Sequence, residues 1–186
     1  FADVDLTDTH TVSAIKVSGT LGGTLTLGSV AESATTSDGS VPWTYSVANS
    51  NTQYLAAGQT TSEVFTVTIN DGKGGTTTQN VTVTATGTND TPTITTTGIT
   101  NVTGAVTEDV AVVAATLTDT GTITFDDVDL TNTHTVSSVS KASGTLGGNL
   151  TFGNVSEDAT TTAGSVPWTY TVDNSATQYL AKDQTA

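Results

Sequence analysis

Apolar and polar residues alternate along much of this chain with the period of a β-strand. In residues 63–70, Phe65 and Val67 alternate with polar residues and so point to one side. Residues 79–86 alternate in the same way. The intervening run 71–75 is rich in glycine, which adopts positive φ without strain, so the two segments predict a β-hairpin.

Several further segments have the same character. The alternation in residues 41–47 places Trp43 on an apolar face as a core residue, and residues 21–27 predict a short hairpin. We expect additional strands at residues 106–110 and 114–119, and no helix. Threonine and valine are frequent throughout, and their branched side chains favour strands. The pattern predicts an all-β fold, a tandem antiparallel β-sandwich of immunoglobulin or cadherin type.

One long stretch occurs twice. Residues 1–61 recur as residues 125–186, with one residue inserted near Ser138. A period of about 125 residues corresponds to a whole domain rather than to a solenoid repeat. We therefore expect a piece of a tandem array, in which residues 1–90 form a first repeat that lacks its opening strand. Residues 91–186 form a second repeat that lacks its closing hairpin.

Composition excludes several functions. The net charge is −14, with only four Lys or Arg residues, so the chain cannot neutralise phosphates and a nucleic-acid role is excluded. There is no cysteine and hence no disulfide framework. We expect no membrane span, because no apolar run approaches the ~18 residues that a span requires.

Aspartates cluster at the start of each copy. Asp3, Asp5 and Asp8 lie close together, and the second copy carries Asp127 and Asp129. Clustered carboxylates next to flexible backbone suit Ca²⁺, which takes several oxygen ligands. A zinc or copper site is disfavoured by the absence of cysteine and by a single histidine per copy. The alternative is that these aspartates form turns and keep the chain soluble.

Catalytic motifs are not apparent. His10 and His134 occupy equivalent positions, which is typical of hydrogen-bonded strand residues. We find no nucleophile elbow, no ordered Ser, His and Asp set and no phosphate-binding glycine loop. The sequence therefore predicts that the protein is not an enzyme.

Two stretches resemble a known family. Residues 121–136 resemble the opening of the VCBS repeat, and residues 70–75 followed by 81–92 resemble its closing hairpin and linker. This family forms tandem cadherin-like domains in large bacterial surface and secreted proteins. The resemblance implies an immunoglobulin-like sandwich that acts as an extender in adhesins and biofilm-matrix proteins, exported by type I secretion. It also implies an extracellular or bacterial cell-surface location.

Cadherin-like repeats bind Ca²⁺ between domains, and the resemblance assigns ligands accordingly. It implies one site from a linker pair and an Asp-x-Asp pair, an equivalent site in the first repeat, and an acidic residue that serves a following junction. The linker, residues 88–91, has fewer carboxylates than a full cadherin linker. The implied ligands of the site between the repeats are Asn89 and Asp90 of the linker with Asp127 and Asp129. Those of the equivalent site in the first repeat are Asp3, Asp5 and Asp71, and Glu108 is the acidic residue that serves a following junction.

These observations predict a structural extender that Ca²⁺ stiffens at the junction between neighbouring repeats of the same chain. Two alternatives stay open. Threonine rows such as residues 66–68 and 82–84 suit a module that binds a glycan or ice. The incomplete repeats also suit homo-assembly into an extracellular filament, in which residues 62–90 of one chain complete the C-terminal half of the next.

Overall fold

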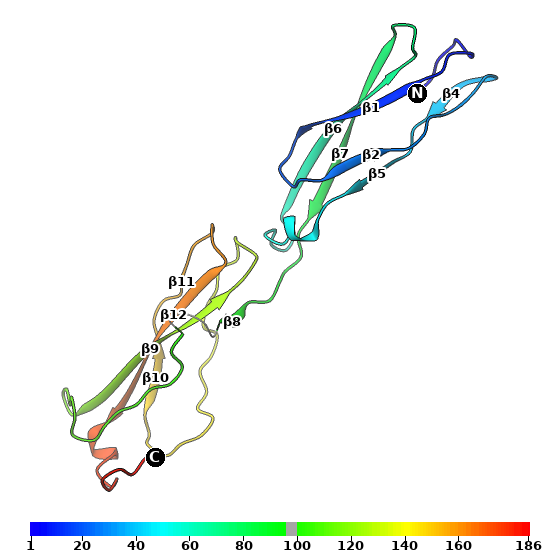
Figure 1. Ribbon diagram of the computed structural model, residues 1–186. Helices are drawn as coiled ribbons and strands as arrows, with labels where there is room; N and C mark the ends of the chain where they lie inside the picture. Colours follow the sequence, from blue (N-terminus) through cyan, green and yellow to red (C-terminus); the bar gives the residue numbers. More distant parts are fainter. Residues whose placement is uncertain (96–99) are drawn as a thin grey trace. The chain divides into compact units, whose positions relative to one another are not determined.

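The fold is all-β, as the alternation predicts. The computed structural model describes residues 1–95 and 100–186, in which strands are antiparallel and the only helical elements are two single 3₁₀ turns, η1 (Asn49–Asn51) and η2 (Asn174–Ala176). The chain divides into two compact units, unit 1 (Phe1–Asn89) and unit 2 (Asp90–Ala186), shown in Figure 1. This division falls one residue before the boundary expected from the sequence. No helix in the described parts has the length and apolar character needed to cross a membrane.

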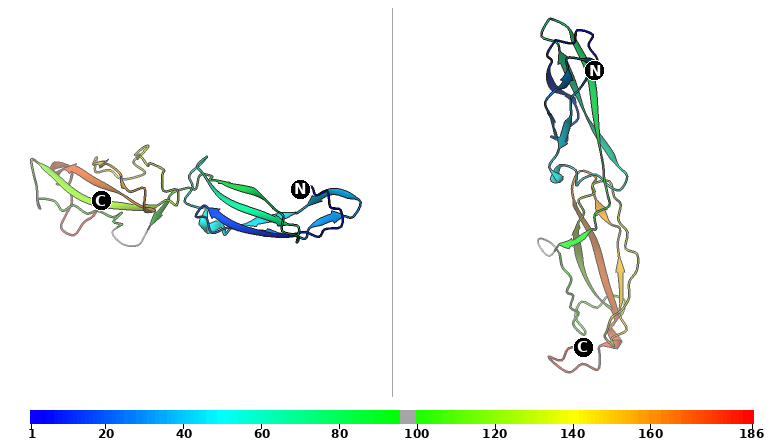
Figure 2. Two further views of the ribbon diagram at one scale, coloured as in Figure 1. Left: turned by 90° about the horizontal axis from the view of Figure 1, so that it is seen from above. Right: turned by 90° about the vertical axis from the view of Figure 1, so that its right-hand side faces the viewer.

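Unit 1 contains one three-stranded sheet and two strand pairs. The three-stranded sheet has the order β1-β6-β7, and β2 pairs with β5 while β3 pairs with β4. In Figure 2, β2 and β5 run along β6 and β7. The strands are β1 (Thr11–Ser18), β2 (Thr24–Leu27), β3 (Ala31–Ser33), β4 (Thr36–Ser40), β5 (Trp43–Ser46), β6 (Thr60–Asn70) and β7 (Thr76–Thr86).

The hairpin predicted from alternation is confirmed in β6 and β7. The two strands pair in continuous register from Thr60 opposite Thr86 to Asn70 opposite Thr76. Asp71 Oδ1 closes the turn by accepting from the N–H groups of Lys73 (2.7 Å) and Gly75 (2.9 Å). The turn therefore uses both the glycines and an aspartate side chain to reverse the chain.

The core of unit 1 lies between β6 and the β2–β5 pair. Phe65 and Val67, the inward residues of β6, form a buried cluster with Leu25 of β2, and Tyr45 packs against it. The Tyr45 and Phe65 rings meet edge to face with centroids 6.0 Å apart, a favourable aromatic arrangement. The two sheets are thus held together by the alternating apolar residues of their facing sides.

The hairpin expected at residues 21–27 is wrong. Only Thr24–Leu27 is a strand, and it pairs with β5 rather than with its own preceding residues. Leu21 is instead a fully buried core residue. The N–H groups of Gly22 and Gly23 donate to the Glu63 carboxylate, so the glycines serve a tertiary contact as well as a turn.

Unit 2 has one sheet of order β10-β12-β9-β8, with β11 also paired to β12. The strand predicted at residues 106–110 is wrong, since that segment is a loop. A strand near residues 114–119 is present but begins later, because Ala114 and Ala115 take positive φ in the turn before it. The strands are β8 (Thr93–Thr95), β9 (Thr116–Asp126), β10 (Asn149–Phe152), β11 (Ser156–Glu157) and β12 (Ala163–Asp173).

The two tryptophans show that the same sequence has different surroundings in the two units. Trp168 is 6% exposed, and its Nε1 donates to the Asn101 carbonyl at 2.6 Å. Its ring lies against Gly104 and Gly121, where a side chain would collide with it. Trp43 is 47% exposed, and no described residue packs over its ring in the way that residues 101–105 pack over Trp168. The prediction of a core tryptophan is therefore right for the second copy and wrong for the first.

Strand β1 is a second segment whose two copies differ in structure, this time with the ordered copy in unit 1. Its residues become a strand by pairing with β6, from Thr11 opposite Asn70 onward. The copy of this segment in unit 2, residues 135–143, forms no strand. Among the described residues of unit 2, no strand lies beside this segment in the way that β6 lies beside β1. Strand formation here depends on the neighbouring strand more than on local sequence.

Candidate cation-binding clusters

In unit 2 the acidic residues follow directly after β9. Asp127 is 5% and Asp129 2% exposed, an unusual degree of burial for carboxylates. The Asp129 N–H donates to Asp127 Oδ1 at 2.9 Å, which folds the backbone around the first carboxylate. Asp129 Oδ2 accepts from the Asp90 N–H (2.8 Å) and from Asn132 Nδ2 (3.1 Å). The entry segment of unit 2 is thereby tied to this cluster.

One oxygen in this cluster has no partner. Asp129 Oδ1 is fully buried and makes no hydrogen bond, and no other buried side-chain nitrogen or oxygen in the described chain shares that condition. A buried carboxylate oxygen without a donor is costly. A bound cation would satisfy it, so the donor set of Asp127 and Asp129 fits a hard metal ion such as Ca²⁺.

A histidine links this cluster to a third carboxylate. His134 Nε2 lies 2.9 Å from Asp127 Oδ2, and its Nδ1 lies 2.6 Å from Glu157 Oε2. The Glu157 carboxylate also accepts from the His134 N–H at 2.9 Å. Burial alone would lower the pKa of His134, but the bonds to Glu157 and Asp127 raise it above its ordinary value. Both ring nitrogens are engaged, so the ring braces two acidic loops and is not poised as a free base.

Unit 1 repeats this bracing geometry. His10 Nε2 lies 3.0 Å from Asp3 Oδ2, and its Nδ1 lies 2.7 Å from Glu32 Oε2. The Phe1 ring packs tilted against the His10 ring with centroids 4.6 Å apart, as Phe125 packs against His134 with centroids 4.8 Å apart. Burial opposes and the two carboxylates favour a raised pKa for His10, and the carboxylates prevail. The contacts of a histidine with an aspartate and a glutamate are therefore built twice.

The acidic cluster of unit 1 differs in its members. Asp3, Asp8 and Asp71 bring carboxylate oxygens within 4.8 Å of one another, the one such triad in the described residues. Asp5 is exposed and contributes backbone groups: its N–H donates to Asp3 Oδ1 (2.9 Å) and its carbonyl accepts from the Asp8 N–H (2.9 Å). The N–H of Asp5, together with the His10 ring, holds the pKa of Asp3 below its ordinary value despite burial. Three converging carboxylates repel one another and suit a divalent cation.

Of the remaining predicted residues, only Asp90 contacts one of these clusters, through its N–H bond to Asp129. Asn89 is the exposed last residue of unit 1, whereas Asp90 is the half-buried first residue of unit 2. Glu108 is half-buried in a loop, at the end of unit 2 opposite to Asp127. Its neighbour Asp109 is the residue that makes contacts there, accepting from Asn174 Nδ2 at 2.7 Å.

Sequence reasoning missed the contacts that His10 and His134 each make with two carboxylates. The resemblance also left Asp8 out of its ligands, although the clustering of aspartates had included it. The signal was present in the repeat, because His10 with Glu32 and His134 with Glu157 recur at matching positions. Their separation along the chain hid the contact, which only the fold reveals.

Comparisons with known proteins add no assignment: no family model, curated protein or solved structure matches this chain.

Proposed function

We propose that the chain comprises two immunoglobulin-like β-sandwich repeats of a non-catalytic structural extender in a secreted or cell-surface bacterial adhesin or biofilm-matrix protein. The duplicated set of contacts between a histidine, an aspartate and a glutamate is the observation that carries this proposal. Asp127, His134 and Glu157 in unit 2 match Asp3, His10 and Glu32 in unit 1, pair by pair. Because both units carry these contacts, the contacts are expected to serve the structure of the repeat and not a task special to one unit.

The acidic ends are proposed to hold Ca²⁺. Asp127 and Asp129 would be the ligands in unit 2, with the partnerless Asp129 Oδ1 as the leading one. Asp3, Asp8 and Asp71 would be the ligands in unit 1. Ca²⁺ supplies positive charge and accepts several oxygen ligands in a flexible shell. Hard oxygen donors without cysteine favour it over softer metals.

Metal binding at these positions would stiffen each unit mechanically. Asp129 also accepts from the Asp90 N–H, so fixing the Asp129 carboxylate fixes the segment through which the chain enters unit 2. Asp71 closes the β6–β7 turn while its carboxylate lies in the unit 1 triad, so that turn would be fixed as well. Loops that repel in the apo protein would become ordered in the loaded one.

The expected energy is modest and suits an extracellular module. Sites of that kind have dissociation constants of about 10⁻⁴–10⁻³ M. A ligand that binds only the folded state at 100-fold above its dissociation constant adds ~2.7 kcal/mol of stability. The net charge of −14 and the absence of cysteine are consistent with a chain that folds after export.

Calorimetric titration with Ca²⁺ tests the proposal. We expect saturable heat, reduced in Asp129→Asn, which removes the charge at the partnerless oxygen. Asp183→Asn, the same charge change at the opposite end of unit 2, should leave the heat unchanged. Absence of any saturable heat in the wild-type chain would refute calcium binding.

A second candidate function, a surface-binding module, is favoured by the outer face of the β1–β6–β7 sheet. Ser13, Thr68 and Thr78 lie side by side across the three strands, and Ser62 Oγ bonds Thr84 Oγ1 at 2.9 Å. Such hydroxyl rows could face a glycan or ice. Binding to a glycan array or inhibition of ice recrystallisation, lost in Thr68→Val, would support this function, and inactivity in both assays would exclude it.

A further inference from the structure

Five Asn-x-Ser/Thr triplets occur in this chain, and x is proline in none of them, so each matches the acceptor motif for an N-linked glycan. A chain rich in threonine contains such triplets by chance, so the surroundings of each asparagine decide which of them can be modified. Two triplets have the same sequence, Asn-Val-Thr, at residues 80–82 and 101–103. The other three begin at Asn89, Asn149 and Asn154.

The triplet 101–103 lies in a loop and folds back onto its own asparagine. Asn101 Oδ1 accepts from the Thr103 N–H at 3.2 Å and from Thr103 Oγ1 at 3.4 Å. Both residues are exposed. The two bonds engage Oδ1 and neither engages Nδ2, which is the atom that carries an N-linked glycan. The hydroxyl that defines the motif is therefore already on the asparagine side chain.

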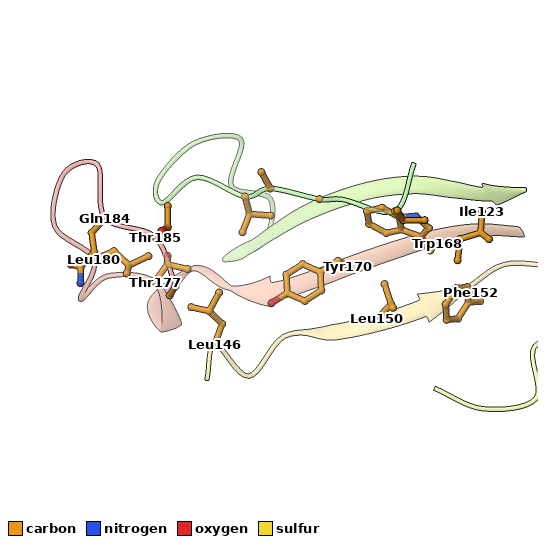
Figure 3. A pocket seen from close by; sticks show the side chains of 15 residues that line it. Ile123, Leu146, Leu150, Phe152, Trp168, Tyr170, Thr177, Leu180, Gln184 and Thr185 are labelled. Atoms are coloured by element: carbon orange, nitrogen blue, oxygen red, sulfur yellow. The ribbon is translucent and has the colours of Figure 1, made fainter. Parts of the chain in front are cut away.

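The backbone of Asn101 is fixed by two strands of unit 2. Its N–H donates to the Thr122 carbonyl of β9 at 2.7 Å, and its carbonyl accepts from Trp168 Nε1 of β12 at 2.6 Å. Trp168 lines the apolar cavity of unit 2 that Figure 3 shows. The sheet thus holds the asparagine in one place while its side chain stays exposed. A group held in this way loses little conformational freedom when an enzyme binds it.

The identical triplet 80–82 is held in a strand instead. It lies within β7, where Asn80 is opposite Thr66 of β6. Asn80 Oδ1 accepts from Thr66 Oγ1 at 2.8 Å, so this oxygen is bonded to the neighbouring strand. To form the turn that residues 101–103 make, residues 80–82 would have to separate from β6.

Two further triplets have their third residue in a strand. Thr151 belongs to β10, and its hydroxyl donates to the Thr169 carbonyl at 3.3 Å. Ser156 belongs to β11, where it is opposite Ser165 of β12. Both residues are therefore held in a ladder, unlike Thr103.

From these contrasts we infer that Asn101 is a site of N-linked glycosylation, at which a glycosyltransferase attaches a sugar from a diphosphate-activated donor. The bonds donated to Oδ1 draw electron density from the amide and make a proton on Nδ2 easier to remove. A base of the transferase takes that proton, and the Nδ2 electron pair forms a bond to the anomeric carbon of the sugar. The bond from that carbon to the diphosphate oxygen breaks, and the diphosphate leaves with its electron pair. This inference does not depend on calcium.

Two reactions on the folded chain test the inference and identify the donor. One contains a soluble N-glycosyltransferase with UDP-glucose, and the other contains a membrane oligosaccharyltransferase with an oligosaccharide on polyprenyl diphosphate. Peptide mass spectrometry then maps the modified asparagines. We expect sugar on Asn101 in at least one reaction, and the reaction that succeeds shows whether the donor is a nucleotide or a lipid. Absence of sugar from Asn101 in both reactions would overturn the inference.

The triplet 80–82 is the matched control for sequence. In the folded chain Asn80 should be modified at least about tenfold more slowly than Asn101, because β7 must open locally before Asn80 can enter an enzyme. In short peptides that carry each triplet this preference should disappear. Equal rates in the folded chain would overturn the inference, and so would the same preference in the peptides, since flanking residues rather than the turn would then select Asn101.

Substitutions in the triplet 101–103 test the role of the hydroxyl. Thr103→Ser keeps the donor to Asn101 Oδ1 and should retain the modification. Thr103→Val keeps the shape of the side chain without the hydroxyl and should lose it, as should Asn101→Gln. Undiminished modification of Thr103→Val would contradict the inference.

Discussion

Glu63 is the residue whose removal should most damage unit 1. Its side chain is fully buried, yet four donors converge on it, at 3.0 Å from the Gly22 N–H, 3.1 Å from the Gly23 N–H and 2.9 Å from Tyr45 Oη, together with Lys16. Burial alone would raise the pKa of Glu63, but the bonds from Lys16 and Tyr45 lower it below its ordinary value. Burial and the nearby charge raise the pKa of Tyr45 to about 12. The carboxylate is thus ionised and fully engaged.

The cost of Glu63→Ala follows from these contacts. Removing one partner of a buried ion pair typically costs ~3–5 kcal/mol, because the other charge is left without compensation. The Lys16 side chain is 31% exposed and can regain water, which places the estimate near the lower end, about 3 kcal/mol. For a unit of this size each kcal/mol shifts the melting temperature by about 4–8 °C, so we expect a fall of about 12–24 °C. Glu63→Gln should give a smaller fall, since one amide oxygen still accepts.

Differential scanning calorimetry in excess chelator at neutral pH measures this effect. The transition of unit 1 should move while that of unit 2 stays in place. Glu108→Ala is the matched control, because Glu108 is half-buried and has no hydrogen-bond partner in the described chain, so its loss should cost no more than about 0.5 kcal/mol. A fall of less than about 4 °C for Glu63→Ala would refute the reasoning, since it would mean that the contacts of the Glu63 carboxylate contribute under 1 kcal/mol to the stability of unit 1.

Three other outcomes follow from the structure. A chain carrying Trp43→Phe, which keeps only the buried Trp168, should fluoresce at shorter wavelength and resist acrylamide quenching better than a chain carrying Trp168→Phe; identical spectra would contradict the burial difference. The pKa of His134 is raised above its ordinary 6.5, so its contribution to stability is complete below pH 6.5 and is lost as pH rises through the folded-state pKa. The melting temperature of unit 2 in chelator should therefore fall over that range, and His134→Gln should flatten the profile; a flat wild-type profile would argue against the brace. Asp109→Ala should destabilise unit 2 in urea titrations, since it leaves Asn174 and Gln178 without their acceptor, whereas an unchanged midpoint would mean that the loop is held by other contacts.

Local pattern was sufficient for the parts of the fold that are governed by alternation. The β6–β7 hairpin could be predicted because Phe65 and Val67 alternate with polar residues and because the turn between the strands contains glycine and Asp71. The same reasoning held for Trp168 and failed for Trp43, although the sequences around the two residues match. Burial there depends on whether residues 101–105 pack over the ring, which no local window contains.

The candidate sites were predictable only in part. Clustering of aspartates along the sequence pointed to one end of each unit, and the structure places Asp129 there as a buried residue. The histidine braces join residues more than twenty positions apart, such as His134 and Glu157, so spacing alone could not reveal them. The role of Asp8 depends on the turn that Asp5 makes with backbone groups, which brings a different carboxylate beside Asp3.

Thermal unfolding with Ca²⁺ and with chelator, resolved for each unit, tests the proposed calcium-stabilised repeat most directly. We expect both units to melt higher in Ca²⁺, by about 10–20 °C at 100-fold above the dissociation constant. Asp127→Asn combined with Asp129→Asn should abolish the rise in unit 2 and leave it in unit 1, while Asp183→Asn should preserve both. Identical melting of the wild-type chain in Ca²⁺ and in chelator would contradict the account and leave the aspartates as formers of turns.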